Sequence, residues 1–230
     1  MILILDFLAL IISIVIHEVS HGWVAHKLGD NTASRQGRLS LNPLKHLDIM
    51  GSVLVPIMFY VAKLPILGWA KPVPVNINEL KKPYRDMMLI ALAGPLSNIA
   101  LVILFTIIFN FLLFNFYSNN TTFVLYFSLS MVRINIILTL FNLIPIPPLD
   151  GSRVLMFFSP HKLKHYLHKV EPYGFLVLFF LLYFGLLNKI IFPLFMIIFN
   201  LCMPKSNLLG FFDTRFLDFL PFNSIGNVVC

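Results

Sequence analysis

The chain has 230 residues, of which 58% are hydrophobic and 12% are charged, and its formal net charge is +7. Soluble domains contain roughly 45–50% apolar and about 25% charged residues, so this composition excludes an ordinary soluble protein. Most lysines and arginines lie in short loops between apolar runs, a distribution that orients membrane proteins and gives no support to nucleic-acid binding. The apolar runs at residues 1–25, 51–68, 88–116, 121–145 and 173–203 predict an all-α polytopic membrane protein with about four to six transmembrane helices.

The first apolar run, residues 1–25, contains a single charged residue, Asp6, before the motif His17-Glu18-Val19-Ser20-His21. Residues four apart share one face of a helix, so both imidazoles can bind one Zn²⁺ while Glu18 acts as a base on water. An unpaired glutamate in a lipid-embedded helix is costly, which favours a metal site over histidines that only pack against a neighbouring helix. Because no basic segment precedes this run, we expect it to remain in the mature protein and not to be a cleaved signal peptide.

The second apolar run, residues 51–68, lies between two basic loops at residues 27–45 and 71–85. Basic loops favour the cytoplasmic side, and a segment with both ends on one side cannot cross completely. Pro56, Lys63 and Pro65 also interrupt it. We therefore predict a re-entrant or interfacial hairpin here. The alternative is one full span with a tilted helix.

The third and fourth runs, residues 88–116 and 121–145, are joined by an uncharged segment, so we expect the chain to leave and return across the membrane between them. Arg133 lies inside the fourth run and is expected to face water or a carboxylate. Closely spaced prolines then end this run before Asp150, and Gly151 permits a sharp turn. This geometry makes Asp150 the candidate third metal ligand, with an ordinary aspartate at the water boundary as the alternative.

The last third of the chain carries weaker signals. Residues 161–169 interleave three histidines with three lysines, and we favour a basic amphipathic helix on lipid head groups over a metal site formed by His161, His165 and His168. Residues 173–203 are predicted to form one kinked helix or a tight hairpin, broken in the middle by Asn188, Lys189 and Pro193. We expect one membrane-embedded domain at residues 1–203 and a phenylalanine-rich interfacial tail at residues 204–230.

Two motifs together carry a family resemblance. His17-Glu18-Val19-Ser20-His21 on the first run and Asn142-x-x-Pro-x-Pro-x-Leu-Asp-Gly151 after the fourth resemble the site-2 protease family of intramembrane zinc metalloproteases. Leu41-Asn42-Pro43, Gly68-Trp69-Ala70-Lys71-Pro72-Val73-Pro74-Val75-Asn76 and Ala93-Gly94-Pro95-Leu96-Ser97-Asn98 are similar to its compact bacterial branch. The likeness covers most of residues 10–160.

The resemblance implies a role for each matching residue. His17, His21 and Asp150 would bind one Zn²⁺ per chain, and Glu18 would be the general base. Asn142 would steady the substrate or its oxyanion, although an interhelical hydrogen bond explains an asparagine there equally well. Asn98 would pack helices together or touch the substrate. An extended edge that could bind unwound substrate as an added strand would include Gly68, Trp69, Lys71, Pro72 and Val73.

The expected activity is that of an intramembrane zinc metalloendopeptidase. Its substrate would be a membrane protein or a signal-peptide-like segment, cleaved in or near a transmembrane stretch. The resemblance implies a multi-pass protein of the bacterial cytoplasmic membrane with its active site toward the cytoplasm. A catalytically inactive zinc-binding scaffold and a zinc transporter are the alternatives. The oligomeric state is not predicted.

Overall fold

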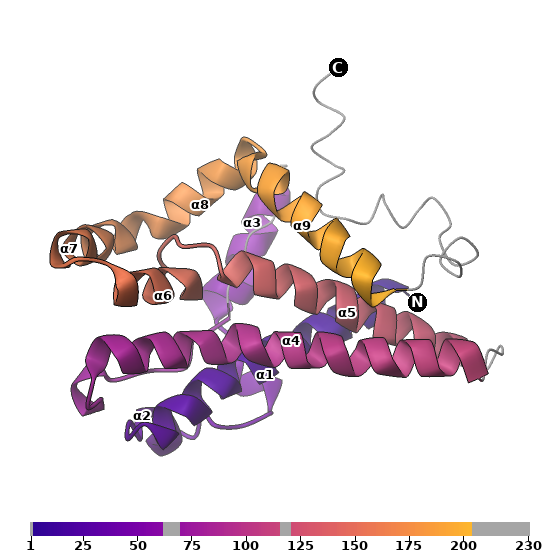
Figure 1. Ribbon diagram of the computed structural model, residues 1–230, viewed down its shortest axis with the longest axis horizontal. Coiled ribbons are helices and arrows are strands. Elements are labelled where there is room, and N and C mark those ends of the chain that lie inside the picture. Colours follow the sequence, from indigo (N-terminus) through magenta and orange to yellow (C-terminus); the bar gives the residue numbers. More distant parts are fainter. Residues whose placement is uncertain (1, 62–69, 116–120, 204–230) are drawn as a thin grey trace.

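The computed structural model describes residues 2–61, 70–115 and 121–203. Within these ranges the secondary structure is entirely helical, with no strand. Three helices are long and apolar enough to cross a membrane: α1 (Ile2–Lys27), α4 (Pro83–Asn115) and α5 (Thr122–Asn142). They contact one another as a bundle, and α4 and α5 lie side by side (Figure 1). The predicted all-α membrane fold is confirmed.

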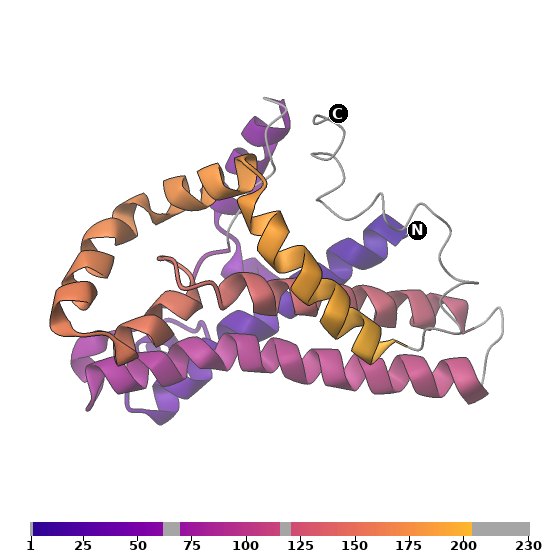
Figure 2. The same ribbon diagram turned by 45° about the horizontal axis from the view of Figure 1, so that its top comes forward.

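The chain after α5 forms an open hoop beside this bundle (Figures 1 and 2). The hoop runs from α6, which packs on α4, to α9, which packs on α5. Its helices are α6 (Asp150–Phe158), α7 (His161–Val170), α8 (Gly174–Tyr183) and α9 (Leu186–Cys202). The stretch His161–Tyr183 and α9 together qualify as a fourth candidate span, bent by 75°. With it, the described chain reaches the lower end of the expected number of spans.

The bend between α8 and α9 lies at Gly185, where φ is +67°. Residues with side chains rarely adopt this left-handed conformation, so the chain turns at the glycine. The predicted break within residues 173–203 is confirmed, but its predicted position at Asn188, Lys189 and Pro193 was wrong, because all three lie inside α9. Asn188 and Lys189 fall in or next to the first helical turn, where backbone N–H groups lack helical partners and polar side chains are tolerated.

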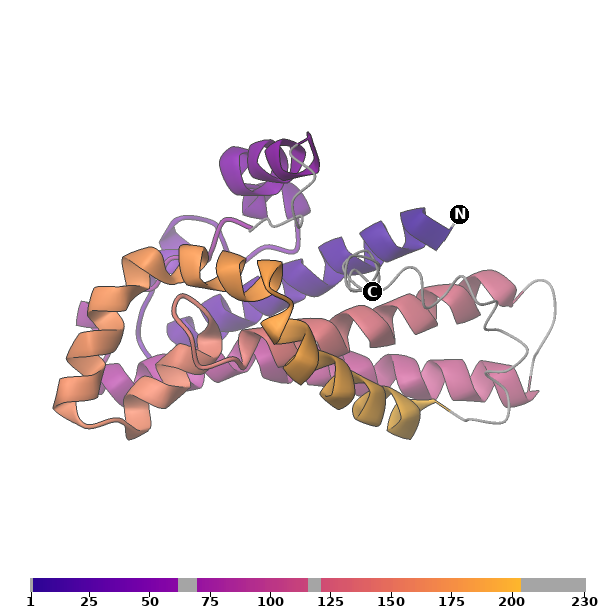
Figure 3. The ribbon, with the colours of Figure 1, turned by 90° about the horizontal axis from the view of Figure 1, so that it is seen from above.

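The segment between α1 and α4 includes a π-helical turn, Met50–Leu54, and the short helix α3 (Val55–Val61). Together they extend about 18 Å, short of the roughly 30 Å needed to cross the hydrocarbon core. Figure 3 shows α3 at the edge of the molecule, apart from the bundle. Residues 62–69, which would form the returning half of the predicted hairpin, lie outside the described residues, so the hairpin stays a prediction.

One hydrophobic core lies between α4, α5 and α9. Its fully or almost fully buried side chains include Phe109, Leu125, Val132, Phe195 and Phe199. Burying a large apolar side chain stabilises a protein by roughly 1.5–3 kcal/mol in water, but lipid is as apolar as leucine, so packing contacts matter more among membrane helices. This core therefore fixes how α4, α5 and α9 are rotated against one another.

An ion pair inside the bundle joins α1 to α5. Arg133 donates to Asp6, and the hydroxyl of Ser130 donates to the same carboxylate at 2.6 Å. The arginine side chain is 9% exposed and the aspartate 19%. The sequence predicted water or a carboxylate for Arg133, and the structure identifies Asp6 as the partner. About two turns further along α1, Asn135 of α5 donates to Ser13 at 2.8 Å, so polar contacts set the register of these two helices.

Candidate metal centre

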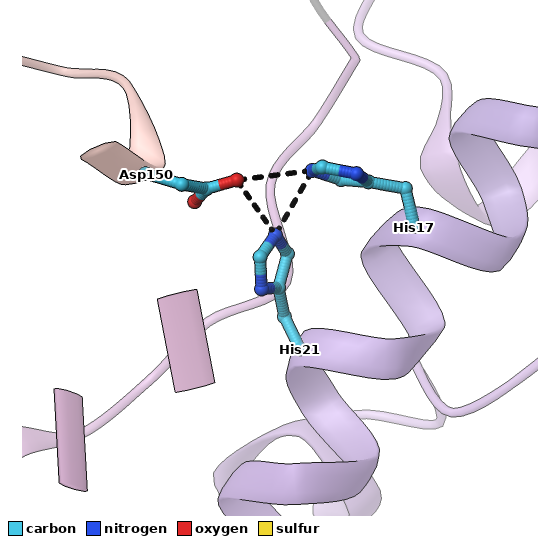
Figure 4. Close-up of side chains that lie close together, drawn as sticks. All are labelled: His17, His21 and Asp150. Atoms are coloured by element: carbon cyan, nitrogen blue, oxygen red, sulfur yellow. Dashed lines mark hydrogen bonds and ion pairs between the residues drawn. The ribbon is translucent and has the colours of Figure 1, made fainter. Parts of the chain in front are cut away.

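Three side chains from two distant parts of the chain converge inside the helix bundle (Figure 4). His17 and His21 lie on α1, and Asp150 is the first residue of α6. The two Nε2 atoms are 3.0 Å apart, and Asp150 Oδ2 lies 3.2 Å from His17 Nε2 and 3.4 Å from His21 Nε2. Both histidines are buried. In the described part of the chain, no other cluster of histidine, cysteine and acidic side chains has the geometry to hold a metal ion.

This arrangement fits zinc. Ligand atoms that lie roughly 2.0–2.2 Å from a tetrahedral zinc ion are about 3.3 Å from one another, close to the three distances in this cluster. His21 Nδ1 lies 2.7 Å from the carbonyl oxygen of Ile90 and must donate to it, so Nε2 of the neutral ring presents a lone pair. Asp150 Oδ2 is buried and accepts no hydrogen bond. Acceptor atoms that face one another in this way are suited to a shared cation.

The loop between α5 and α6 brings Asp150 to the histidines. It contains a cis peptide bond between Pro147 and Pro148. A Cβ atom on Gly151 would lie 2.2 Å from the carbonyl oxygen of Leu143, so only glycine lets the start of α6 fold back so closely on the end of α5. The sequence predicted a sharp turn at Gly151. The structure shows that the requirement is close backbone approach.

Helix α4 provides no ligand, but groups on it contact the Nδ1 atoms of both histidines, which face away from the cluster. Ile90 accepts from His21 Nδ1, and the side-chain amide of Asn98 lies 3.1 Å from His17 Nδ1. Between them, a Cβ atom on Gly94 would lie 2.5 Å from His17 Cε1 and 2.5 Å from His21 Nε2. The sequence indicated the Ala93-Gly94-Pro95 stretch only as part of the family resemblance, whereas in the structure Gly94 makes room for the two rings.

Glu18 is half-buried, and its carboxylate is held by residues 70–76, a segment without regular secondary structure. The backbone N–H of Val73 donates to Glu18 Oε2 at 3.0 Å. Pro72 and Pro74 have no N–H, so Val73 is the backbone donor at the middle of this segment. Lys71 and Pro72 are exposed beside it. Of the predicted substrate edge, Gly68 and Trp69 lie outside the described residues.

Two further contacts hold the ends of this segment. Lys71 N–H donates to the carbonyl of His46 at 2.9 Å, and Asn76 N–H donates to Asp30 Oδ2 at 2.7 Å. Burial of Asp30 raises its pKa, but hydrogen bonds from Thr32 and Asn76 outweigh burial, so the pKa lies below the ordinary 3.8. The charged form of Asp30 therefore ties the end of α1 to the segment that holds Glu18.

The two predicted asparagines differ in their surroundings. Asn98 is fully buried against His17. Asn142 is half-buried at the end of α5, and its amide donates to the carbonyl of Leu138 one turn earlier at 3.0 Å. Within the described ranges, no hydrogen bond joins Asn142 to the three clustered side chains. Its predicted role at the oxyanion stays a prediction.

Comparison with known proteins gives a family. A family model described as "Peptidase family M50" matches residues 116–185, which include Asp150. "Putative zinc metalloprotease YwhC" of Bacillus subtilis (strain 168) is 37% identical over 193 residues, 81% of this chain and 84% of that protein. "Putative zinc metalloprotease Rip2" of Mycolicibacterium smegmatis is 27% identical over 188 residues, 80% of this chain and 68% of that protein. No solved structure matches.

The alignment with the relative from Bacillus subtilis covers most of this chain and most of that protein. The cluster of His17, His21 and Asp150 and the apolar helices agree with the membrane zinc metalloprotease that this relative and the family model indicate. The protein is thus a multi-pass membrane protein with a zinc-compatible centre. The chain belongs to peptidase family M50, the site-2 protease family of zinc metalloproteases.

Proposed function

We propose that this protein is an intramembrane zinc endopeptidase that hydrolyses a peptide bond in or near a transmembrane segment of a membrane protein or signal-peptide-like substrate. The observation that carries the proposal is the convergence of Asp150, from α6, with His17 and His21 of α1, a helix long and apolar enough to span a bilayer. A peptidase centre at that position acts on chains that are themselves in the membrane.

In this proposal His17, His21 and Asp150 hold the metal, and Glu18 moves the proton. Zinc, when bound, supplies a Lewis acid that polarises the scissile carbonyl and makes nearby water more acidic. Glu18 takes a proton from the attacking water on its carboxylate and delivers it to the leaving amine nitrogen. The Val73 N–H fixes Oε2 of Glu18, so the carboxylate is oriented before the substrate arrives.

The substrate must become extended at the scissile bond, because peptide groups inside an intact helix are shielded by their own hydrogen bonds. The segment around Lys71, Pro72 and Val73 supports this step, since it lies outside any helix, exposes Lys71 and Pro72 and contacts Glu18 through the Val73 N–H. We assign Asn142 to the substrate carbonyl or its oxyanion, which requires its amide to leave the Leu138 carbonyl.

The active site faces the cytoplasm of a bacterial cell membrane in this proposal. His21 lies near the end of α1 that leads into the first basic loop, and Arg35 of that loop pairs with Glu79 of the second at 3.1 Å. Basic loops mark the cytoplasmic side. Residues 1–203 act as one membrane-embedded peptidase domain, and residues 204–230, outside the described residues, form its interfacial tail.

The substitution Glu18→Gln tests the proposal, because it removes the base and keeps a side chain of the same size. In proteoliposomes with a membrane-segment reporter, we expect at least about 100-fold slower cleavage with one zinc per chain retained. Glu79→Gln makes the same chemical change away from the cluster and should retain most of the activity. Cleavage by Glu18→Gln at the wild-type rate contradicts the proposal, as does zinc uptake into the vesicles without any cleavage.

A further inference from the structure

Asn98 lies on α4, one helical turn after Gly94, and faces the metal helix. Its side chain is 0% exposed and His17 beside it is 6% exposed. The amide nitrogen Nδ2 lies 3.1 Å from His17 Nδ1, while the amide oxygen Oδ1 is buried and accepts no hydrogen bond. Among the described residues, the side-chain amide of Asn98 therefore has one hydrogen-bonding neighbour, which is the Nδ1 atom of His17 on the side of the ring away from the cluster.

The protonation of His17 decides which amide atom belongs next to it. Nε2 of His17 faces His21 and Asp150, so a neutral ring that binds metal there carries its hydrogen on Nδ1. An Nδ1–H group requires an acceptor. The two ends of an asparagine amide have nearly the same shape, and a half-turn of the side chain exchanges Nδ2 for Oδ1 without moving its neighbours.

His21 provides the precedent within the same cluster. Its Nδ1 donates to the carbonyl oxygen of Ile90 at 2.7 Å. Ile90 and Asn98 are eight residues apart on α4, two turns along one face of the helix. Each histidine thus has one ring nitrogen toward the cluster and the other toward a group on the same face of α4.

We infer that Asn98 is a positioning residue for the zinc centre, whose Oδ1 accepts a hydrogen bond from His17 Nδ1–H and so fixes the tautomer and the orientation of that ring. The inference rests on the proposed function, since it takes His17 as a ligand. It replaces the sequence-based expectation that Asn98 packs helices or touches substrate. Outer partners of ligating histidines typically change metal affinity by roughly 10–100-fold when they are removed.

The matched control is Asn110, which lies on the same helix. Its amide donates to the carbonyl of Cys202 on α9 at 3.3 Å, and its Oδ1 is also buried without a partner. Asn110 therefore has the helix-packing role that Asn98 would have if its contact with His17 were only structural. Replacing each asparagine by leucine removes the amide and keeps a branched side chain with the same number of heavy atoms.

The test measures zinc affinity of the full-length protein in detergent micelles by competition with chelators, together with thermal unfolding of the zinc-free form. We expect Asn98→Leu to weaken zinc binding by about 10–100-fold, Asn98→Asp to recover most of it because a carboxylate also accepts, and Asn110→Leu to leave it unchanged. If Asn98→Leu does not fold, Asn98→Ala compared with Asn98→Asp gives the same contrast.

Wild-type zinc affinity in Asn98→Leu, or equal losses in Asn98→Leu and Asn110→Leu, would overturn the inference. His17→Ala separates it from the proposed function. Wild-type affinity in His17→Ala means that the proposed ligand set is wrong. An absence of proteolysis with the expected order of affinities means that the proposed activity is wrong while the role of Asn98 stands.

Discussion

The substitution Gly94→Ala should weaken zinc binding by at least about 100-fold without unfolding the protein. Gly94 lies on α4 against the imidazoles of His17 and His21. A methyl group there would lie 2.5 Å from His17 Cε1 and 2.5 Å from His21 Nε2, whereas unbonded heavy atoms prefer about 3.5–4.0 Å. The added carbon therefore enters the space where the two rings meet.

The size of the effect follows from these distances. Both rings must retreat by about 1 Å to relieve the contacts, and Zn–N bond lengths tolerate only roughly 0.2 Å. One zinc ion can then no longer bind both Nε2 atoms. A displacement of about 1 Å at a catalytic centre costs on the order of 100-fold in rate, and we expect at least that loss in both zinc affinity and proteolysis.

The zinc-free protein should respond differently. Alanine is about 1 kcal/mol more favourable than glycine inside a helix, and free histidine side chains can rotate away from the methyl group. Thermal unfolding of the zinc-free form should therefore begin no earlier in Gly94→Ala than in the wild type. Chelator competition and thermal unfolding in the same detergent measure the two quantities.

Gly185→Ala is the reciprocal control. No atom lies within 4 Å of a Cβ at Gly185, but its φ of +67° strains any residue with a side chain. We expect it to lower the stability of the zinc-free protein by about 1–2 kcal/mol and to leave zinc affinity unchanged. Stoichiometric zinc binding at wild-type affinity in Gly94→Ala would refute this prediction, because the distance between α4 and the two imidazoles would then not determine whether zinc binds.

Three other substitutions test the supporting structure. Asp6→Asn removes the negative charge that pairs with the buried Arg133 and should destabilise the protein by roughly 3–5 kcal/mol in chemical unfolding, whereas the double variant Asp6→Leu with Arg133→Met should recover most of that loss. Equal stability of both variants would contradict this. Asp30→Asn should reduce the free energy of unfolding at neutral pH by about 1–2 kcal/mol. The folded-state pKa of Asp30 lies below 3.8, so the stability from its charge is complete above pH 3.8 and is lost as the pH falls through the folded-state pKa. Melting curves of variant and wild type should therefore converge in acid. Val73→Pro removes the N–H that Glu18 accepts, while Val73→Ala keeps it; we expect kcat to fall about tenfold more in the proline variant, and similar kcat values would exclude that contact from catalysis.

The sequence alone predicted the parts of the site that depend on local geometry. His17 and His21 share a face because a helix brings residues four apart together, and this holds whatever surrounds the helix. The long apolar runs predicted α1, α4 and α5 because a membrane span requires about twenty apolar residues. Asp150 followed from the prolines that end α5 and from the need for a third ligand on the same side.

The contacts between helices could not be predicted in the same way. Arg133 is the only charged residue of its apolar run, and Asp6 is the only one before the motif in the first run, yet their pairing depends on how α1 and α5 are rotated against each other. The sequence also predicted a break at Asn188, Lys189 and Pro193, whereas the helix continues through all three residues and the chain bends at Gly185. One sequence without related sequences contains no direct information about such rotations.

The arrangement of α1 and α4 explains why the metal helix needs a partner that contributes no ligand. His21 contacts Ile90, and His17 contacts Asn98. The two histidines are four residues apart on α1, their partners are eight residues apart on α4, and Gly94 lies between those partners. Sliding α4 by one helical turn, about 5.4 Å, would remove the acceptor from at least one ring and place a side chain where Gly94 now gives room. The α1–α4 register is thus a condition for two neutral imidazoles to present their Nε2 atoms to the same point. A mutation on α4 far from the cluster that shifts this register should therefore reduce zinc affinity before it reduces helix content.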